Sequence, residues 1–287
     1  MDQMFVQRFM LRRESILLSR INTLNLLTGF QQRLYLPLFI TSGLSVIWSG
    51  ALVAPLQPLV DLLFISILVV MGTVWLYSFN LFRGFSRLRL RMFLLLLSML
   101  IVAVLAIWYG ALSLQRVMVL AGILLLGLIY SAPISLKQRI VRIKDMTLAK
   151  NMCIGLGWGA LVLLASESKP TPALWAVFAF ASCQIAVGSS VRDFFDEQLD
   201  RSIGIKSLVV VYGIERCKPW FHTWNVTTTL LAWSIFPDPG LGIAFAVAAS
   251  LRGLTIHFAD TDSFFWTQVV NILGMTVFLC TIYLTSI

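Results

Sequence analysis

Long apolar blocks separated by short polar stretches dominate the pattern of the chain. Each block runs for about 20 residues, the length that a helix needs to cross a bilayer, and none shows a regular apolar–polar alternation. A helix also satisfies its own backbone hydrogen bonds in lipid. The pattern therefore predicts an all-α fold of nine transmembrane helices, at Leu34–Val53, Leu59–Phe79, Met92–Tyr109, Leu114–Tyr130, Leu148–Ser166, Ala173–Val191, Trp220–Phe236, Leu241–Phe258 and Phe264–Leu284.

The composition agrees with a polytopic, multi-pass integral membrane protein. Of the 287 residues, 59% are hydrophobic and 12% are charged, whereas a soluble domain carries roughly 25% charged residues. The first 33 residues mix apolar and basic side chains, which is typical of a helix lying at the membrane surface. We therefore divide the chain into a cytoplasmic interfacial segment, residues 1–33, and a transmembrane helical domain, residues 34–287.

The basic residues are distributed unevenly among the predicted loops. The formal net charge is +9, and nearly all lysines and arginines fall in the N-terminal segment and in the loops after the second, fourth and sixth spans. Only Arg116 and Lys169 fall on the other side of the membrane. This asymmetry predicts that the basic side is cytoplasmic. Topology and contact with anionic membrane lipids explain the charge, so nucleic acid is not an expected partner.

One glycine-rich stretch, GLGWG at residues 155–159, resembles a nucleotide-binding loop only superficially. It lies inside a predicted span and no strand precedes it. Close packing between two helices is the interpretation that this position favours.

The sharpest signal for chemistry is the polar stretch RDFFDEQLDRSIGIKS after the sixth predicted span. Asp193, Asp196 and Asp200 are spaced by three and four residues, so a helix places them on one stripe. Neighbouring carboxylates repel one another unless a cation lies between them, and Mg²⁺ accepts carboxylate oxygens while leaving positions for phosphate. The stretch predicts a Mg²⁺ site that binds diphosphate. The alternative is a solvated acidic helix start, paired with Arg192 and Arg201.

This stretch resembles the second aspartate-rich motif of the UbiA-type intramembrane prenyltransferases, DxxDxxxD followed by Gly-x-Lys-Ser/Thr, here Gly204, Lys206 and Ser207. The segment YSAPISLK, from Tyr130 to Lys137, is similar to the family's segment after helix four. The resemblance implies nine helices around a central apolar cavity, with Mg²⁺ on the three aspartates. It also implies that Tyr130 and Lys137 lie at the active site, with the lysine on the diphosphate.

The family's first motif, Asn-x-x-x-Asp-x-x-x-Asp at the end of helix two, is degenerate in this chain. Asn80 is present, but Gly84 and Leu88 stand at the aspartate positions, and Leu81 stands where an extra aspartate is common. The usual arrangement of two metal sites around one diphosphate therefore does not carry over whole. Asn80 is expected to bind a metal-bound water or a phosphate, or else to cap the helix.

Two arginines follow this asparagine. If the second helix continues past Phe79, then Asn80, Arg83 and Arg87 form a basic stripe where the family has an acidic one. In one interpretation, the guanidinium groups bind diphosphate directly and replace one metal ion. In the other, Arg83 and Arg87 pair with Asp196 and Asp200, which would make the protein a catalytically retired lipid-binding homologue. The intact second motif favours the first interpretation.

The resemblance implies transfer of an isoprenyl group from an isoprenyl diphosphate to a lipophilic, usually aromatic, acceptor, a reaction of isoprenoid biosynthesis. Stabilisation of the departing diphosphate in a water-poor site is the main catalytic contribution. Tyr130 would shield the allylic cation with its ring, or would be an interfacial tyrosine. The expected catalytic residues are Tyr130, Lys137 and Asp196, and the expected substrate-binding residues are Asn80, Arg83, Arg87, Lys137, Arg192 and Lys206. A terpene cyclase is the alternative enzyme, and a transporter is disfavoured because charges inside the spans are scarce.

Overall fold

The structure is a computed structural model. It describes residues 40, 43–52, 59–81, 86–131, 134–136, 139–141, 143, 146, 148–165, 171–202, 206–259 and 264–286, apart from the side chains at 75–95, 131–141, 199, 202, 264–269, 271–272, 275 and 285–286. All of these residues belong to one compact unit, Ile40–Ile287. The predicted interfacial segment, residues 1–33, lies outside the described residues and stays a prediction.

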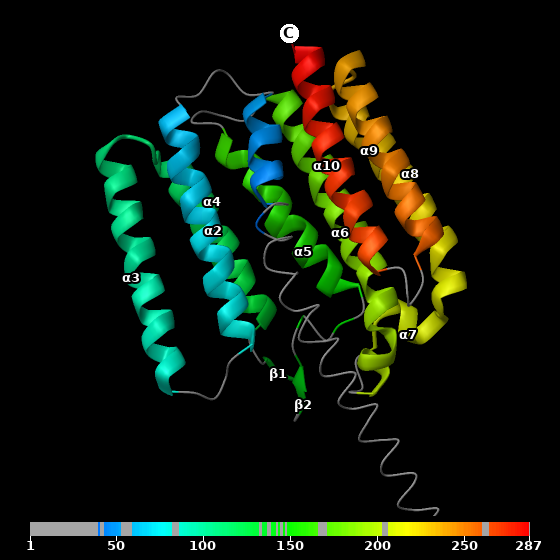
Figure 1. The fold of residues 1–287 in the computed structure, drawn as a ribbon, viewed down its shortest axis with the longest axis horizontal. Helices are drawn as coiled ribbons and strands as arrows, with labels where there is room; N and C mark the ends of the chain where they lie inside the picture. The colour runs from blue at the N-terminus through cyan, green and yellow to red at the C-terminus, as the bar shows by residue number, and fades with distance from the viewer. Residues whose placement is uncertain are drawn as a thin grey trace, which may run out of the picture. The chain divides into compact units, whose positions relative to one another are not determined.

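The apolar blocks of the sequence form helices (Figure 1). The predicted spans from the second to the ninth each coincide with a helix, and the described part of the first is helical at Gly43–Leu52. The elements that follow are α2 (Leu59–Leu81), α3 (Ser86–Trp108), α4 (Leu114–Ser131), β1 (Ile134–Leu136), β2 (Arg139–Val141), α5 (Ala149–Gly159), the 3₁₀ helix η2 (Ala160–Ala165), α6 (Pro172–Ser202), α7 (Leu208–Tyr212), α8 (Ile214–Ile235), α9 (Pro239–Phe258) and α10 (Phe264–Ser286).

Three local features differ from the prediction. The sixth helix does not end at Val191 but continues to Ser202, because hydropathy marks the end of the apolar block and polar residues extend the same helix. Strands β1 and β2 form a small antiparallel hairpin, with Ile134 opposite Val141, in a stretch that was expected to be a loop. The short helix α7 was also not predicted, and it begins where the Ser207 side chain accepts a hydrogen bond from the Val210 amide.

Helix α6 is the element around which the site is built, and it packs against α5, α7, α8 and α9. The glycine-rich stretch lies at the contact between α5 and α6. A Cβ atom added at Gly159 would lie 2.8 Å from the Ser182 Cα, and one added at Gly155 would lie 2.8 Å from the Ala186 Cβ. Real Cβ atoms do not approach so closely, so the predicted close helix packing is confirmed.

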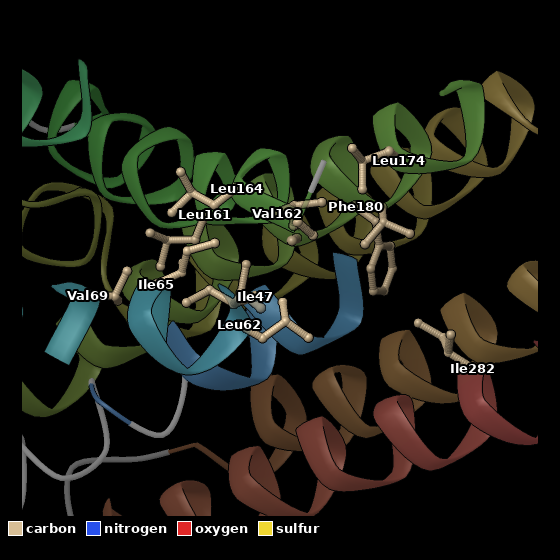
Figure 2. Packing of buried hydrophobic residues seen from close by; sticks show 14 of the residues in the cluster. Ile47, Leu62, Ile65, Val69, Leu161, Val162, Leu164, Leu174, Phe180 and Ile282 are labelled. Carbon is tan, nitrogen blue, oxygen red and sulfur yellow. The ribbon is translucent and has the colours of Figure 1, made fainter. Parts of the chain in front are cut away.

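The apolar core lies between η2, α2 and α6. Figure 2 shows Leu161, Val162 and Leu164 of η2 beside Ile47 and Ile65. A second apolar cluster surrounds the polar end of α6, and it includes Val191, Phe194, Val209, Phe221 and Ile256. Tight packing of this kind is what holds helices together where lipid removes the hydrophobic drive for association.

Many large apolar side chains are exposed, as they are in a protein that faces lipid. On α3, Leu100, Val104 and Ile107 are each more than half exposed. A soluble protein seldom exposes a continuous apolar face of this extent. Among the described helices, two are long and apolar enough to cross a membrane by length and composition, at Pro172–Gln198 and Pro239–Phe258.

A buried ion pair joins the starts of α2 and α4. Arg116 is fully buried, and its Nη1 atom donates to Asp61 Oδ2 at 3.1 Å and to the Ala111 carbonyl at 2.8 Å. Its Nε atom donates to the Leu164 carbonyl at 3.0 Å. Arg116 thus links α2, α4 and η2 inside the protein and is not exposed to water.

Candidate active site

The three predicted carboxylates lie on the continuous helix α6, so the predicted stripe is confirmed. Asp193 is 2% exposed and Asp200 is 6% exposed, while the Asp196 side chain is 26% exposed. Buried carboxylates are costly unless other groups compensate their charge. The burial of Asp193 and Asp200 argues against the alternative of a solvated acidic helix start. The pair with Arg192 that this alternative included is present at Asp196, whereas Arg201 pairs with Glu197 instead.

Asp193 is compensated by the first turn of α5. The Lys150 Nζ atom lies 2.5 Å from Asp193 Oδ1, and the Asn151 Nδ2 atom donates to Asp193 Oδ2 at 3.2 Å. Both oxygens of this carboxylate are therefore engaged. The sequence interpretation assigned Lys150 only to the basic cytoplasmic loop and gave Asn151 no role.

Asn151 is the centre of a small polar network between α5 and α6. It is fully buried, and its Nδ2 atom also donates to Ser190 Oγ at 2.8 Å. Its Oδ1 atom accepts a hydrogen bond from Ser189 Oγ at 2.8 Å. No local spacing links residues so far apart in the chain, so no sequence motif pointed to this network.

Asp196 faces Arg192 one turn earlier on the same helix. The Arg192 Nε atom lies 3.5 Å from Asp196 Oδ2, and both side chains are about a quarter to a third exposed. An i,i+4 pair of this kind contributes only about 0.3–0.5 kcal/mol. Asp196 therefore remains available to another cation.

Asp200 is the least satisfied of the three carboxylates, and it lies beyond the apolar part of α6. Its Oδ2 atom is buried and has no hydrogen-bond partner among the described residues. Burial raises the pKa of Asp200 to about 6, against the lowering effects of Lys150 and of a hydrogen bond with Ser207. An orphaned buried oxygen of this kind marks a place where a bound cation would be stabilised.

The donor set fits a divalent ion at Asp196 and Asp200 better than at all three aspartates. Carboxylate oxygens are the ligands that Mg²⁺ prefers, and Mg²⁺ often takes only one or two of them together with phosphate oxygens. The described side chains contain no ready-made cluster of three histidine, cysteine or acidic ligands. The assignment of Asp193 as a metal ligand stays a prediction. In this structure Lys150 occupies the position from which a metal ion would bind Asp193 Oδ1.

The other predicted site residues are described only in part. Lys137 and Arg83 lie outside the described residues, and the side chains of Asn80 and Arg87 do too. The backbone shows that Asn80 lies in α2 and that Arg87 lies in α3, which begins at Ser86. Asn80 and Arg87 therefore lie on different helices, so the continuous helix on which the predicted basic stripe depended is not formed.

Two further predicted residues lie near the ends of elements. Tyr130 is half-buried in the last turn of α4, and Lys206 is exposed just before α7. Their predicted roles stay predictions.

A small pocket lies on α6, nearer the start of the helix than the carboxylates. Phe180, Gln184 and Arg252 are among its lining residues, and its wall is mostly apolar. Gln184 precedes Asp193 by nine residues, which is about 14 Å of helix. The Arg252 guanidinium lies between them, because a Cβ atom added at Gly188 would be 2.9 Å from its Nη1. The cavity volume of about 70 Å³ is below the roughly 300–1,000 Å³ of typical ligand pockets.

Comparison with known proteins gives a family match and several related folds. A model of the UbiA prenyltransferase family matches residues 85–264, more than half of the chain. No curated protein sequence matches the chain significantly.

The solved structures show the same fold at low identity. A structure of digeranylgeranylglyceryl phosphate synthase is 14% identical with a TM-score of 0.61, and the match covers 91% of this chain and 98% of that one. The apo structure of a UbiA homolog from Aeropyrum pernix K1 is 13% identical with a TM-score of 0.62, covering 86% and 97%. A UbiA homolog from Archaeoglobus fulgidus bound to DMAPP and Mg²⁺ is 14% identical with a TM-score of 0.56, covering 86% and 96%.

Proposed function

Because this chain belongs to the UbiA prenyltransferase family, we propose that it is a multi-pass membrane enzyme that transfers an isoprenyl group from an isoprenyl diphosphate to a lipophilic acceptor. The positive-inside distribution of Lys and Arg favours a cytoplasmic position for the carboxylates. The UbiA homolog from Archaeoglobus fulgidus, solved with DMAPP and Mg²⁺ and also with GPP and Mg²⁺, supports the same class of donor here.

One observation carries the proposal: a buried, incompletely neutralised carboxylate stripe and an apolar pocket share one helix. Asp200 keeps an unpartnered buried oxygen at the polar end of α6, and Phe180 lines the pocket about five turns closer to its start. An isoprenyl diphosphate has a charged diphosphate head, which would bind at the carboxylates, and a hydrocarbon tail, which would bind in the apolar pocket. The small pocket would have to widen when a long isoprenyl chain enters.

The proposed roles follow from these positions. Asp196 and Asp200 would hold one Mg²⁺, and the ion would supply positive charge that stabilises the departing diphosphate. The basic residues Lys137, Arg83 and Arg87 are proposed to bind the phosphate oxygens. Tyr130 is proposed to face the allylic cation. The acceptor is lipophilic, because it must reach the site from within the membrane.

A retired lipid-binding homologue is the second candidate, and a specific contact favours it. Lys150 already neutralises Asp193, which removes one carboxylate from metal binding. If basic residues neutralised all three carboxylates, the site would not bind Mg²⁺ and would not promote loss of diphosphate from an isoprenyl diphosphate. The orphaned oxygen of Asp200 argues against complete neutralisation.

The test is pyrophosphate release by the purified protein in detergent. Isoprenyl diphosphates of several chain lengths are supplied with Mg²⁺, with and without a lipid extract as the source of acceptor, and the products are identified by mass spectrometry. We expect Mg²⁺-dependent release that requires an acceptor and is lost in Asp196→Ala. Release without any acceptor would favour the cyclase, and no release at any chain length would favour the lipid-binding homologue. Glu215→Ala, a change at an exposed carboxylate outside the site, is the matched control.

A further inference from the structure

Lys150 is held at the head of the candidate site by a partly buried ion pair with Asp193. Its ammonium lies 2.5 Å from Asp193 Oδ1, and its side chain is only 17% exposed. The partner carboxylate is 2% exposed and is fixed on its other oxygen by Asn151. Asp193 is thus a rigid anchor for the lysine. A flexible surface lysine has no such anchor and moves among many conformations.

A purely structural link between α5 and α6 does not require this lysine. Asn151 alone bridges the two helices through Ser190 and Asp193, and the glycines of α5 already allow close packing. Replacing a buried ion pair by apolar groups is often neutral or stabilising, so stability is a weak reason for its presence.

Lys150 also acts on the rest of the carboxylate stripe. It lies within electrostatic range of both Asp196 and Asp200. The ammonium group has three donors, and one is used on Asp193. In the described part of the chain the other two have no hydrogen-bond partner, so both can donate to an anion that approaches the polar end of α6.

The formal charges show what the site lacks. Three carboxylates, with Lys150 and Arg192 as their cationic partners, leave a formal charge of −1. One divalent ion changes this formal charge to +1, which favours binding of the diphosphate anion. Without Lys150 and Arg192, the three carboxylates would need more metal ions to reach the same charge.

On the basis of the proposed function, we propose that Lys150, clamped by Asp193, is a fixed cation of the diphosphate site that stands in for one divalent metal ion. Lys150 would donate a charge-assisted hydrogen bond to a phosphate oxygen while keeping Asp193 out of metal coordination. The chain would therefore bind pyrophosphate weakly without metal and would bind one divalent ion through Asp196 and Asp200.

The test uses the full chain in detergent with two probes and no turnover. Calorimetry with EDTA present measures metal-free binding of inorganic pyrophosphate, and electron paramagnetic resonance measures binding of Mn²⁺ alone. In Lys150→Met we expect pyrophosphate affinity to fall about tenfold or more, the factor for one charge-assisted hydrogen bond. We expect Mn²⁺ affinity to rise on the order of tenfold, because Asp193 becomes a free ligand.

Three variants separate this role from others. Lys218→Met removes the same charge from a partly exposed pair with Glu215 on α8 and should change neither affinity. Lys150→Arg should retain most pyrophosphate binding. If Lys150→Met does not fold, Lys150→Met with Asp193→Asn removes both charges, and it should lose pyrophosphate binding without gaining Mn²⁺ affinity.

Two results would overturn the inference: no metal-free pyrophosphate binding by the unaltered chain, or unchanged affinities for both probes in the variants without Lys150. Lys150 would then be only a link between helices. A chain that binds pyrophosphate through Lys150 but releases none from isoprenyl diphosphates would instead refute the proposed enzyme and leave the inference standing.

Discussion

Replacement of Arg116 by methionine tests the buried ion pair that joins α2, α4 and η2. Methionine keeps an unbranched stem and much of the volume of the side chain, but it is shorter than arginine and donates no hydrogen bond. It therefore leaves Asp61, whose side chain is 10% exposed, without its cation. It also removes the donor from the carbonyls of Ala111 and Leu164.

The expected loss follows from these contacts. A buried charge that loses its partner costs about 3–5 kcal/mol, a large part of a total stability of roughly 5–15 kcal/mol. The double variant Asp61→Leu with Arg116→Met removes the charge as well, so we expect a smaller loss, about 1–2 kcal/mol, from the two carbonyls. The difference between the single and double variants measures the cost of the uncompensated Asp61 carboxylate.

Unfolding in mixed micelles, followed by the fluorescence of the nine tryptophans, gives the free energies. The matched control is Arg201→Met, because Arg201 pairs with Glu197 at 2.7 Å but is 63% exposed, and exposed pairs contribute about 0–1 kcal/mol. The reasoning is refuted if Arg116→Met is no less stable than the control. It is also refuted if the double variant is as unstable as Arg116→Met.

Three further predictions concern helix packing and the polar end of α6. Gly159→Ala is expected to destabilise by about 1–3 kcal/mol in the same unfolding assay, because the new methyl would overlap Ser182. Gly122→Ala, with open space around it, should be neutral or slightly stabilising. Asn151→Ala should cost about 1–3 kcal/mol, because it leaves buried polar partners unsatisfied; stability equal to the unaltered protein would contradict the network. Asp200→Asn should raise the melting temperature of the metal-free protein at about pH 8 and abolish its further rise with Mn²⁺. The stabilisation should begin to shrink as the pH falls through about 6 and should disappear near pH 4, because burial raises the folded pKa of Asp200 from 3.8 to about 6 and the destabilising effect is lost only when the group is protonated in both states; a pH-independent difference would contradict this assignment.

The helices were predictable from the sequence, because apolar blocks of bilayer length leave the backbone no other solution in lipid. Their ends were less predictable. Helix α6 continues through charged residues to Ser202, because hydropathy reports where lipid contact ends and not where the backbone hydrogen bonds end. The hairpin of β1 and β2 was not predictable, because each strand has only three residues and such a short strand shows no clear alternation of apolar and polar positions.

The candidate site was predictable where it is local. The spacing of Asp193, Asp196 and Asp200 follows from helix geometry alone. The partners of these aspartates were not predictable, because Lys150 precedes Asp193 by 43 residues and was assigned from the sequence to a basic loop whose charge the positive-inside rule explains without any contact. Tertiary contacts of this kind leave no periodic trace in a single sequence.

The buried carboxylates of the described helices differ in how far the protein neutralises them, and this difference separates structure from function. Asp61 meets a fully buried arginine whose Nε and Nη1 atoms also donate to backbone carbonyls, so this ion pair is built into the packing of the helices. Asp193 meets a lysine whose two other ammonium donors have no hydrogen-bond partner among the described residues. Asp200 keeps a buried oxygen with no hydrogen-bond partner in the described part of the chain, although burial makes such an oxygen expensive. The Asp61–Arg116 pair shows that the chain can compensate a buried acid with its own residues, so the incomplete compensation at Asp200 is the feature on which the proposed cation site depends.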